Sequence, residues 1–239
     1  MKKFLGIVMI ALCMLFTSCN SCSKKADPVS NDTVIEMVKG VDVNYITGSD
    51  ISWMGMHYPD VEWRWVECCI DMKDFIDEAD TCEVLAVANI FSYIEIIDSV
   101  KGTFKPYVIL LAHTADTSVI EIREGLWVGD DPMNDYIPME VDFPHAWVRM
   151  MEANCVKPHS RHCVLRREVG PIGGVDPIYI FGNKDTQVYV MSNTGDVTTH
   201  NPVFPIDSND VFIADTITYE GTIYGPRNTR IGCPLGEWP

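Results

Sequence analysis

Three long runs of strand-forming residues follow one another in the middle of the chain, at residues 83–97, 104–113 and 118–128. The segments between them, DSVKGT and TADT, have the length and composition of hairpin turns. Runs joined in this way predict an antiparallel meander. A buried helix is the alternative for residues 83–97, because the leucine, alanines and asparagine in that run do not favour a strand.

A further strand is predicted ahead of the meander, over VEWRWVECCI at residues 61–70. The alternation of residue types puts its two tryptophans on one face of the strand and Arg64 on the other. The acid-rich stretch at residues 71–81 is predicted to be a short helix or a loop. Together with the meander, these segments predict an antiparallel, β-rich first half of the chain.

The second half reads as a helix followed by strands. The segment FPHAWVRMMEAN at residues 143–154 places Pro144 in a first helical turn and continues with several apolar residues, which favours a short amphipathic helix. Strand-like runs then follow at residues 162–169, 177–181, 187–197 and 210–219.

A loop rich in acids and prolines, GDDPMNDYIP, separates the two halves. We therefore predict an α+β fold in two domains. The first is an antiparallel, β-rich domain over residues 33–135. The second spans residues 136–239 and packs a helix on an antiparallel sheet.

The strand run that ends at residue 197 closes with VYVMSNTGDV. With the helix and strands before it, this stretch is similar to the PepSY family of small extracytoplasmic α+β modules; the residues that match are Tyr189, Val190, Thr194, Gly195, Asp196 and Val197. Met191 stands where that family usually has an aspartate. The resemblance covers residues 143–199 and implies a PepSY-like binding or peptidase-regulating module without catalytic residues. The alternative is an ordinary turn, in which Gly195 supplies a positive φ angle and Tyr189 packs on the core.

The first 18 residues have the order of a secretory signal, with two lysines, an apolar run and then small residues. The apolar run is shorter than the about 20 residues of a membrane-spanning helix. Cys19 follows directly, so the segment resembles a bacterial lipoprotein signal, which implies cleavage before Cys19 and a diacylglycerol on its sulfur. An ordinary cleaved signal and an uncleaved anchor are the alternatives. The expected product is anchored to a membrane of the cell envelope, faces away from the cytoplasm, and begins with a flexible tether over residues 19–32.

Charge and cysteine content limit the partners and the covalent links. The chain has 18 basic and 34 acidic residues, and such an acidic chain repels nucleic acid. Of nine cysteines, seven remain once Cys13 in the signal and Cys19 are set aside, so at least one cannot pair within the chain. Cys68 and Cys69 are neighbours in a predicted strand and should point to opposite faces.

The segment CVKPHSRHCVLRR contains Cys155, His159, His162 and Cys163 in a C-x3-H-x2-H-C pattern. Thiolates and imidazoles are ligands that zinc prefers, but this spacing fits no standard zinc motif. A disulfide between Cys155 and Cys163, or thiols without a metal, is the favoured interpretation, and we predict no cofactor. A nucleophilic pair of Cys163 and His162 is the least favoured, because neighbours in a strand face apart.

The same segment is the basic island of an acidic chain, through Lys157, Arg161, Arg166 and Arg167. These side chains could contact an acidic partner or lipid phosphates, or could offset neighbouring carboxylates.

The chain carries none of the common catalytic signatures, such as a G-x-S-x-G elbow, an H-E-x-x-H motif or a phosphate-binding loop. We therefore predict a membrane-anchored extracytoplasmic lipoprotein that acts as a non-catalytic binding or regulatory module for a protein or peptide partner. The alternative is an envelope hydrolase whose active-site residues are scattered along the sequence.

Overall fold

The structure is a computed structural model that describes residues 30–125, 139–166, 176–183 and 186–199. Cys19, Arg167 and the predicted strand at residues 210–219 lie outside the described residues, as do most of the predicted tether and the whole of the acidic loop. The described helices are α2 (Asn31–Met37), α3 (Val43–His57) and α4 (Phe143–Glu152), with one 3₁₀ turn, η1 (Ile76–Glu78). The first five strands are β1 (Val38–Gly40), β2 (Trp63–Met72), β3 (Cys82–Asp98), β4 (Thr103–Thr114) and β5 (Ser118–Glu124). The other four are β6 (His162–Arg166), β7 (Ile178–Gly182), β8 (Gln187–Met191) and β9 (Val197–Thr198).

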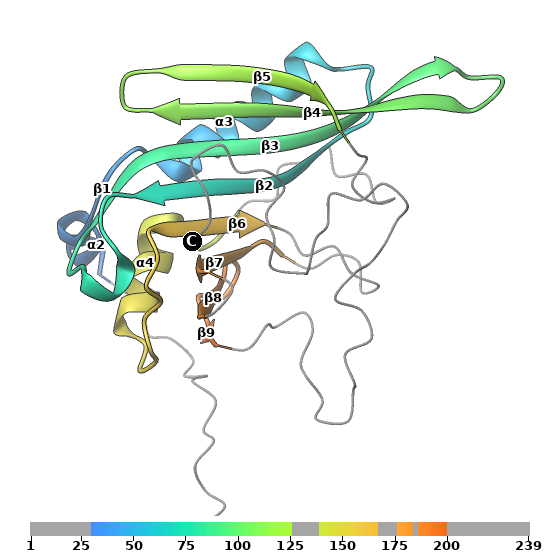
Figure 1. Cartoon of the computed structure of the whole chain (residues 1–239). Coiled ribbons are helices and arrows are strands. Elements are labelled where there is room, and N and C mark those ends of the chain that lie inside the picture. The colour runs from blue at the N-terminus through green and yellow to red at the C-terminus, as the bar shows by residue number, and fades with distance from the viewer. Residues whose placement is uncertain (1–29, 126–138, 167–175, 184–185, 200–239) are drawn as a thin grey trace, which may run out of the picture.

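The nine described strands form one sheet in the order β5-β4-β3-β2-β6-β7-β8-β9, and β1 pairs in parallel with β3 (Figure 1). All other pairings are antiparallel. The combination of helices with a mainly antiparallel sheet confirms the predicted α+β class. The predicted meander is confirmed, and the helical alternative over residues 83–97 is wrong. Partners on both edges of β3 outweigh the weak strand preference of its alanines.

Strand β2 joins the two halves of the chain. One of its edges pairs with β3, and the other pairs with β6, where Ile70 lies opposite Cys163 and Glu67 lies opposite Arg166. The main hydrophobic core also takes residues from both halves. The predicted domains at residues 33–135 and 136–239 are therefore parts of one sheet, which corrects the prediction of two separately packed units.

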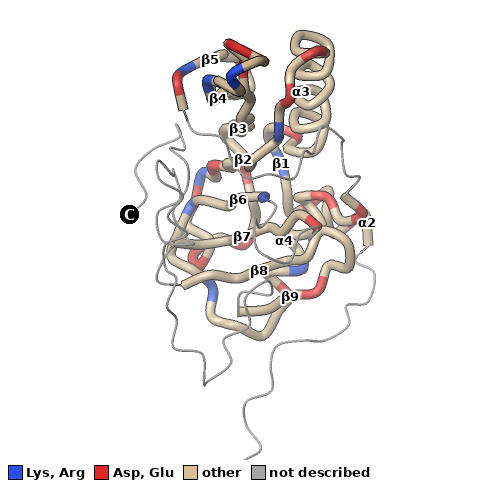
Figure 2. The backbone as a smooth tube through the Cα atoms, turned by 90° about the vertical axis from the view of Figure 1, so that its right-hand side faces the viewer, with Lys and Arg blue, Asp and Glu red and all other residues tan. Residues whose placement is uncertain are grey.

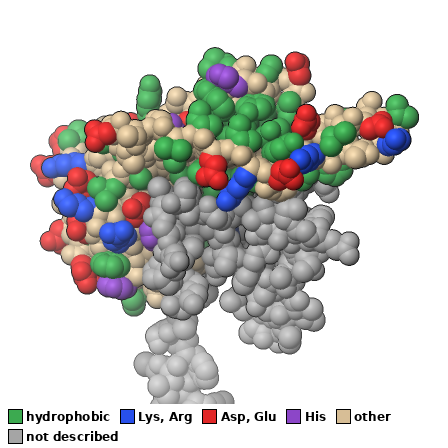
Figure 3. All heavy atoms as spheres, turned by 45° about the horizontal axis from the view of Figure 1, so that its top comes forward, with side chains coloured by type: hydrophobic (Ala, Val, Ile, Leu, Met, Phe, Trp, Pro, Cys, Tyr) green, Lys and Arg blue, Asp and Glu red, His purple; other side chains and the backbone are tan. Residues whose placement is uncertain are grey.

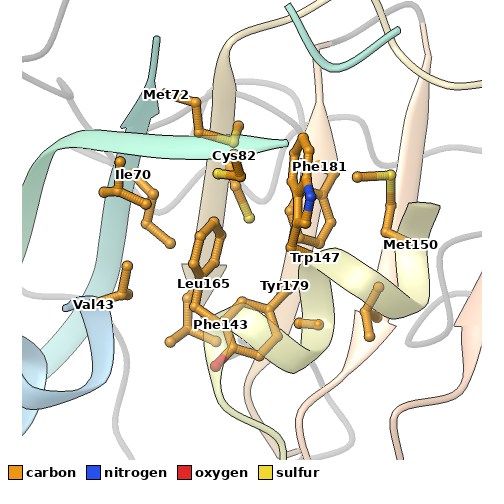
Figure 4. Packing of buried hydrophobic residues seen from close by; sticks show 14 of the residues in the cluster. Val43, Ile70, Met72, Cys82, Phe143, Trp147, Met150, Leu165, Tyr179 and Phe181 are labelled. Atoms are coloured by element: carbon orange, nitrogen blue, oxygen red, sulfur yellow. The ribbon is translucent and has the colours of Figure 1, made fainter. Parts of the chain in front are cut away.

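The predicted helix at residues 143–154 is confirmed as α4. Asp142 caps its start by accepting a hydrogen bond from the His145 amide at 2.9 Å, and Pro144 occupies the first turn, where no amide partner is needed. Trp147 of α4 packs against Phe181 of β7, and Figure 4 shows side chains from β2, β3, β6 and β7 pointing into the same core.

Helix α3 was not predicted from the sequence, because its buried stripe is only half apolar. Val43, Thr47, Asp50 and Met54 are its buried residues, and their spacing of three or four places them on one side of the helix. Two of the four are polar, so a search for apolar periodicity passes over the segment. Asp42 caps the start of α3 by accepting from the Tyr45 amide at 3.0 Å.

The short helix α2 corrects the end of the predicted tether. Asn31 and Asp32 belong to this helix, which Ser30 caps through its side-chain oxygen. Helices α2, α3 and α4 lie on the same side of the sheet (Figure 2). Helix α3 packs over β2 and β3, whereas α2 and α4 pack on the part of the core that includes β6–β8. No helix in the described ranges has the length and apolarity to cross a membrane.

We predict that residues 136–239 do not fold on their own. The fragment would leave β6 without β2 and would expose core side chains such as Leu165 and Phe181, each of which contributes about 1.5–3 kcal/mol when buried. Thermal unfolding followed by circular dichroism should show no cooperative transition for the fragment, while the chain from residue 20 onwards should give one. A cooperative transition of the fragment would restore the two-domain interpretation.

Candidate functional site

A chain of hydrogen bonds connects Asp50, His113 and Ser118 on the helix-covered face of the sheet. The Nε2 atom of His113 lies 2.9 and 3.0 Å from the two carboxylate oxygens of Asp50. The Nδ1 atom of the same ring lies 2.9 Å from the hydroxyl oxygen of Ser118. Asp50 is buried, His113 is half-buried and Ser118 is exposed, so the chain runs from the interior to the surface.

Three elements bring these side chains together. Asp50 comes from α3, and His113 lies opposite Ser118 in the ladder between β4 and β5. The turn between the strands is held by Thr114, whose hydroxyl oxygen accepts from the Thr117 amide at 3.1 Å. The hairpin therefore fixes the two surface residues relative to each other, and the packing of α3 brings the carboxylate to them.

Asn89 of β3 holds the buried end of this chain of hydrogen bonds. Its side-chain amide donates to Asp50 Oδ2 at 2.7 Å, and its own oxygen accepts from the Trp65 indole at 3.2 Å. Burial raises the pKa of Asp50 above its ordinary value, while the hydrogen bond from Asn89 and the nearby His113 oppose this rise. The carboxylate is thus oriented by two partners in a largely dry environment.

The arrangement fixes the roles of the two ring nitrogens. In the neutral ring, the tautomer with its proton on Nε2 donates to the carboxylate, which leaves Nδ1 to accept a hydrogen bond from the Ser118 hydroxyl. A histidine oriented by a carboxylate and bonded to a hydroxyl can draw the proton from that hydroxyl. The same bonds also fasten α3 to the β4–β5 hairpin.

Apolar side chains continue from Ser118 along β5. Side chains at alternate positions of a strand share a face, so Ile120 and Ile122 lie on the face of Ser118. They are 54% and 50% exposed. Figure 3 shows hydrophobic side chains gathered on this side of the molecule. The hydroxyl therefore stands at one end of an exposed apolar row.

The four residues of the predicted cysteine and histidine group do not converge. Cys163 is buried in the core on the helix-covered face, whereas its neighbour His162 projects from the other face, 3.2 Å from Asp71. Cys155 lies at the edge of the core, 3.7 Å from the Lys157 amine. No disulfide joins any of the five cysteines among the described residues, Cys155 and Cys163 included.

His159 instead stands beside two acids of the other half of the chain. Its Nδ1 atom lies 3.0 Å from Asp77 and 4.0 Å from Glu78, and its ring stacks on Phe75. Within the described ranges, the exposed residues Asp77, Glu78 and His159 are the only group of three or more potential metal ligands. Neither cysteine nor His162 belongs to this group, so the four residues do not form the zinc site that was the less favoured alternative.

The predicted basic island is divided between separate contacts. Lys157 donates to the Met150 and Ala153 carbonyl oxygens at the end of α4, where a positive charge also favours the helix dipole. Arg161 lies 3.8 Å from Asp71, and Arg166 is opposite Glu67 in the ladder. Arg161 and Arg166 thus lie beside carboxylates, whereas Lys157 is engaged by main-chain oxygens.

Sequence reasoning did not select Asp50, His113 or Ser118. The signal for two of them is present, because His113 and Ser118 flank the TADT turn and must face each other if the turn forms a hairpin. Asp50 carries no such signal, since it lies on the helix that was not predicted.

Comparison of the chain with protein-family models, with curated proteins and with solved structures found no match in any of the three.

We predict that the stability contribution of Asp50 falls as the pH rises. Its folded-state pKa is raised, so the folded protein holds this proton more tightly than the unfolded chain does. The contribution is complete below the unfolded pKa of about 3.9 and is lost as the pH passes through the folded value. Urea unfolding between pH 3 and 7 should therefore show the free energy of unfolding of Asp50→Asn increasing relative to that of the unsubstituted protein as the pH rises.

The comparison is best made in a His113→Gln background, because the ionisable ring of His113 contacts Asp50. Removal of the histidine takes away an influence that lowers the pKa of Asp50, so the trend should become steeper. If the protein with Asp50 instead became more stable relative to Asp50→Asn as the pH rises, the raised pKa of Asp50 would be contradicted.

Proposed function

We propose that the protein is a lipid-anchored, extracytoplasmic binding module that holds an extended segment of a partner protein along β5. Lipid on Cys19 attaches it to a membrane of the cell envelope. The described part of the chain supplies the binding surface, and the strong negative charge disfavours nucleic acid as a partner.

The observation that carries this proposal is that β5, the last strand in the sheet order, keeps several exposed apolar side chains. Thirteen large hydrophobic residues are exposed in the described ranges, and seven of them fall between residues 96 and 122. These seven are Ile96, Ile97, Val100, Phe104, Val119, Ile120 and Ile122. Ile120 and Ile122 share one face of β5, whereas Val119, Phe104 and Ile96 lie on the opposite face. The row of Ile120 and Ile122 is therefore the part of this surface that one partner segment can cover.

Strand β5 also offers main-chain hydrogen bonds. It ends the strand order, and β4 is its only neighbour among the described strands. An extended segment that adds to such an edge gains main-chain bonds, and its alternate side chains can meet Ile120 and Ile122. Glu121 and Arg123 point to the other face. Charged side chains on an edge strand discourage non-specific pairing with the strands of other molecules.

The likeness of residues 143–199 to PepSY modules is part of the proposal. Helix α4 is followed by the antiparallel strands β6, β7 and β8, and Gly195 adopts a φ angle of 72° in the turn before β9. This order of elements supports a module that binds rather than one that catalyses in this half of the chain.

For the anchor, Cys19→Ala should move the protein from the membrane fraction to the soluble fraction of fractionated cells, because the acyl chains are the proposed attachment. The matched control is Cys22→Ala, which should stay with the membrane. An unchanged membrane share for Cys19→Ala would contradict the lipoprotein interpretation.

For the binding surface, a photo-crosslinking amino acid at position 122 should capture a defined partner in intact cells. The same group at position 35 is the control, because Ile35 is an exposed apolar residue that belongs to α2 and not to β5. The adduct at position 122 should be lost when Ile120→Lys places a charge on the same face of β5. Identical adducts at both positions, or an adduct that persists with Ile120→Lys, would argue against β5 as the docking strand.

A further inference from the structure

We propose that Ser118 is a nucleophile activated by His113, and that it takes up the acyl group of neutral esters with apolar acyl chains. This activity goes beyond the proposed binding function, and it gives a defined site to the alternative of an envelope hydrolase.

The three side chains satisfy the geometric conditions for nucleophile activation. The distance of 2.9 Å between Ser118 Oγ and His113 Nδ1 lies within the hydrogen-bond range that a general base requires. His113 is in turn oriented by both oxygens of a buried carboxylate. Such constellations are recognised by geometry and roles, not by their order in the chain.

The support of the carboxylate distinguishes this group from a casual surface contact. Asp50 is 4% exposed and is held from behind by Asn89, which is itself fully buried. Trp65 fixes the Asn89 amide, so the orientation of the imidazole is set through two layers of side chains. Ser118 alone of the three is open to an incoming molecule.

The reaction balances with water as the only co-reactant. Ser118 Oγ forms a bond to the ester carbonyl carbon and gives its proton to His113 Nδ1. The alcohol leaves as the ester C–O bond breaks, and it takes that proton from His113. Water, deprotonated by His113, then attacks the acyl group on Ser118, and the carboxylic acid is released while the proton returns to the serine oxygen.

The surroundings of Ser118 indicate the substrate class. Ile120 and Ile122 extend from it on the same face of β5, which suits an extended apolar acyl chain. Asp116 in the adjoining turn and the overall charge of −16 disfavour anionic substrates. An ester is preferred to an amide because its alcohol leaves more readily.

The substitution Asp50→Asn separates the chemical role from the structural one. Its side-chain oxygen can still accept from Asn89, and its amide can donate to His113 Nε2. The ring proton then moves to Nδ1, which becomes a donor to Ser118 and can no longer accept its proton. The hydrogen-bond chain persists, but the direction needed for activation is reversed.

The test is covalent labelling of the full chain from residue 20 onwards with an alkyl fluorophosphonate, followed by mass spectrometry of the peptides. We expect labelling at Ser118, no label at that position in Ser118→Ala, and labelling slowed by about 100-fold or more in His113→Gln and Asp50→Asn. Ser52→Ala is the matched control, because Ser52 is an exposed serine whose hydroxyl donates to the Gly48 carbonyl oxygen. The release of p-nitrophenol from p-nitrophenyl hexanoate should follow the same order among the variants.

Labelling of Ser118 at equal rates in the unsubstituted protein and in folded Asp50→Asn would overturn the proposal, as would the absence of labelling at Ser118. If His113→Gln does not fold, Asp50→Asn decides the question alone. Crosslinking at position 122 should be unchanged in Ser118→Ala, so failure of the nucleophile is distinguishable from failure of the binding function.

Discussion

The pairing of β2 with both β3 and β6 is the constraint on which the rest of the structure depends. It places two segments of the chain that are about a hundred residues apart in one sheet, and it gives α3 and α4 a common face to cover. Cys68, Ile70 and Met72 of β2 all contribute to the main core, so the strand is central to packing as well as to hydrogen bonding. A change that displaced β2 would disturb both halves together.

The position of the Asp50–His113–Ser118 chain follows from this sheet. Helix α3 packs over β2 and β3, and this packing carries Asp50 to the exposed end formed by β4 and β5. The buried carboxylate costs desolvation free energy, which its bonds to Asn89 and His113 partly offset. The protein thus keeps a costly polar group beside the face of β5 that carries Ser118, Ile120 and Ile122.

Local patterns in the sequence predicted the meander and α4, because hairpin turns and a proline at a helix start leave signals within a few residues. The pairing of β2 with β6 leaves no such signal, since it joins segments far apart in the chain. Helix α3 was not predicted because the polar residues Thr47 and Asp50 occupy its buried stripe. The group of Asp50, His113 and Ser118 was missed for the same reason. The spacing of Cys155, His159, His162 and Cys163 suggested one site, but the strand sends His162 and Cys163 to opposite faces.

Native-state hydrogen exchange tests the central claim that the chain forms one sheet joined by β2. Amides in the middle of β3 and of β7 lie on opposite sides of β2 in the strand order. If the sheet is one cooperative unit, the slowest amides of both strands should exchange with the same free energy, equal to that of global unfolding. A distinctly lower free energy for β7 than for β3 would show that the two halves open independently and would contradict the account.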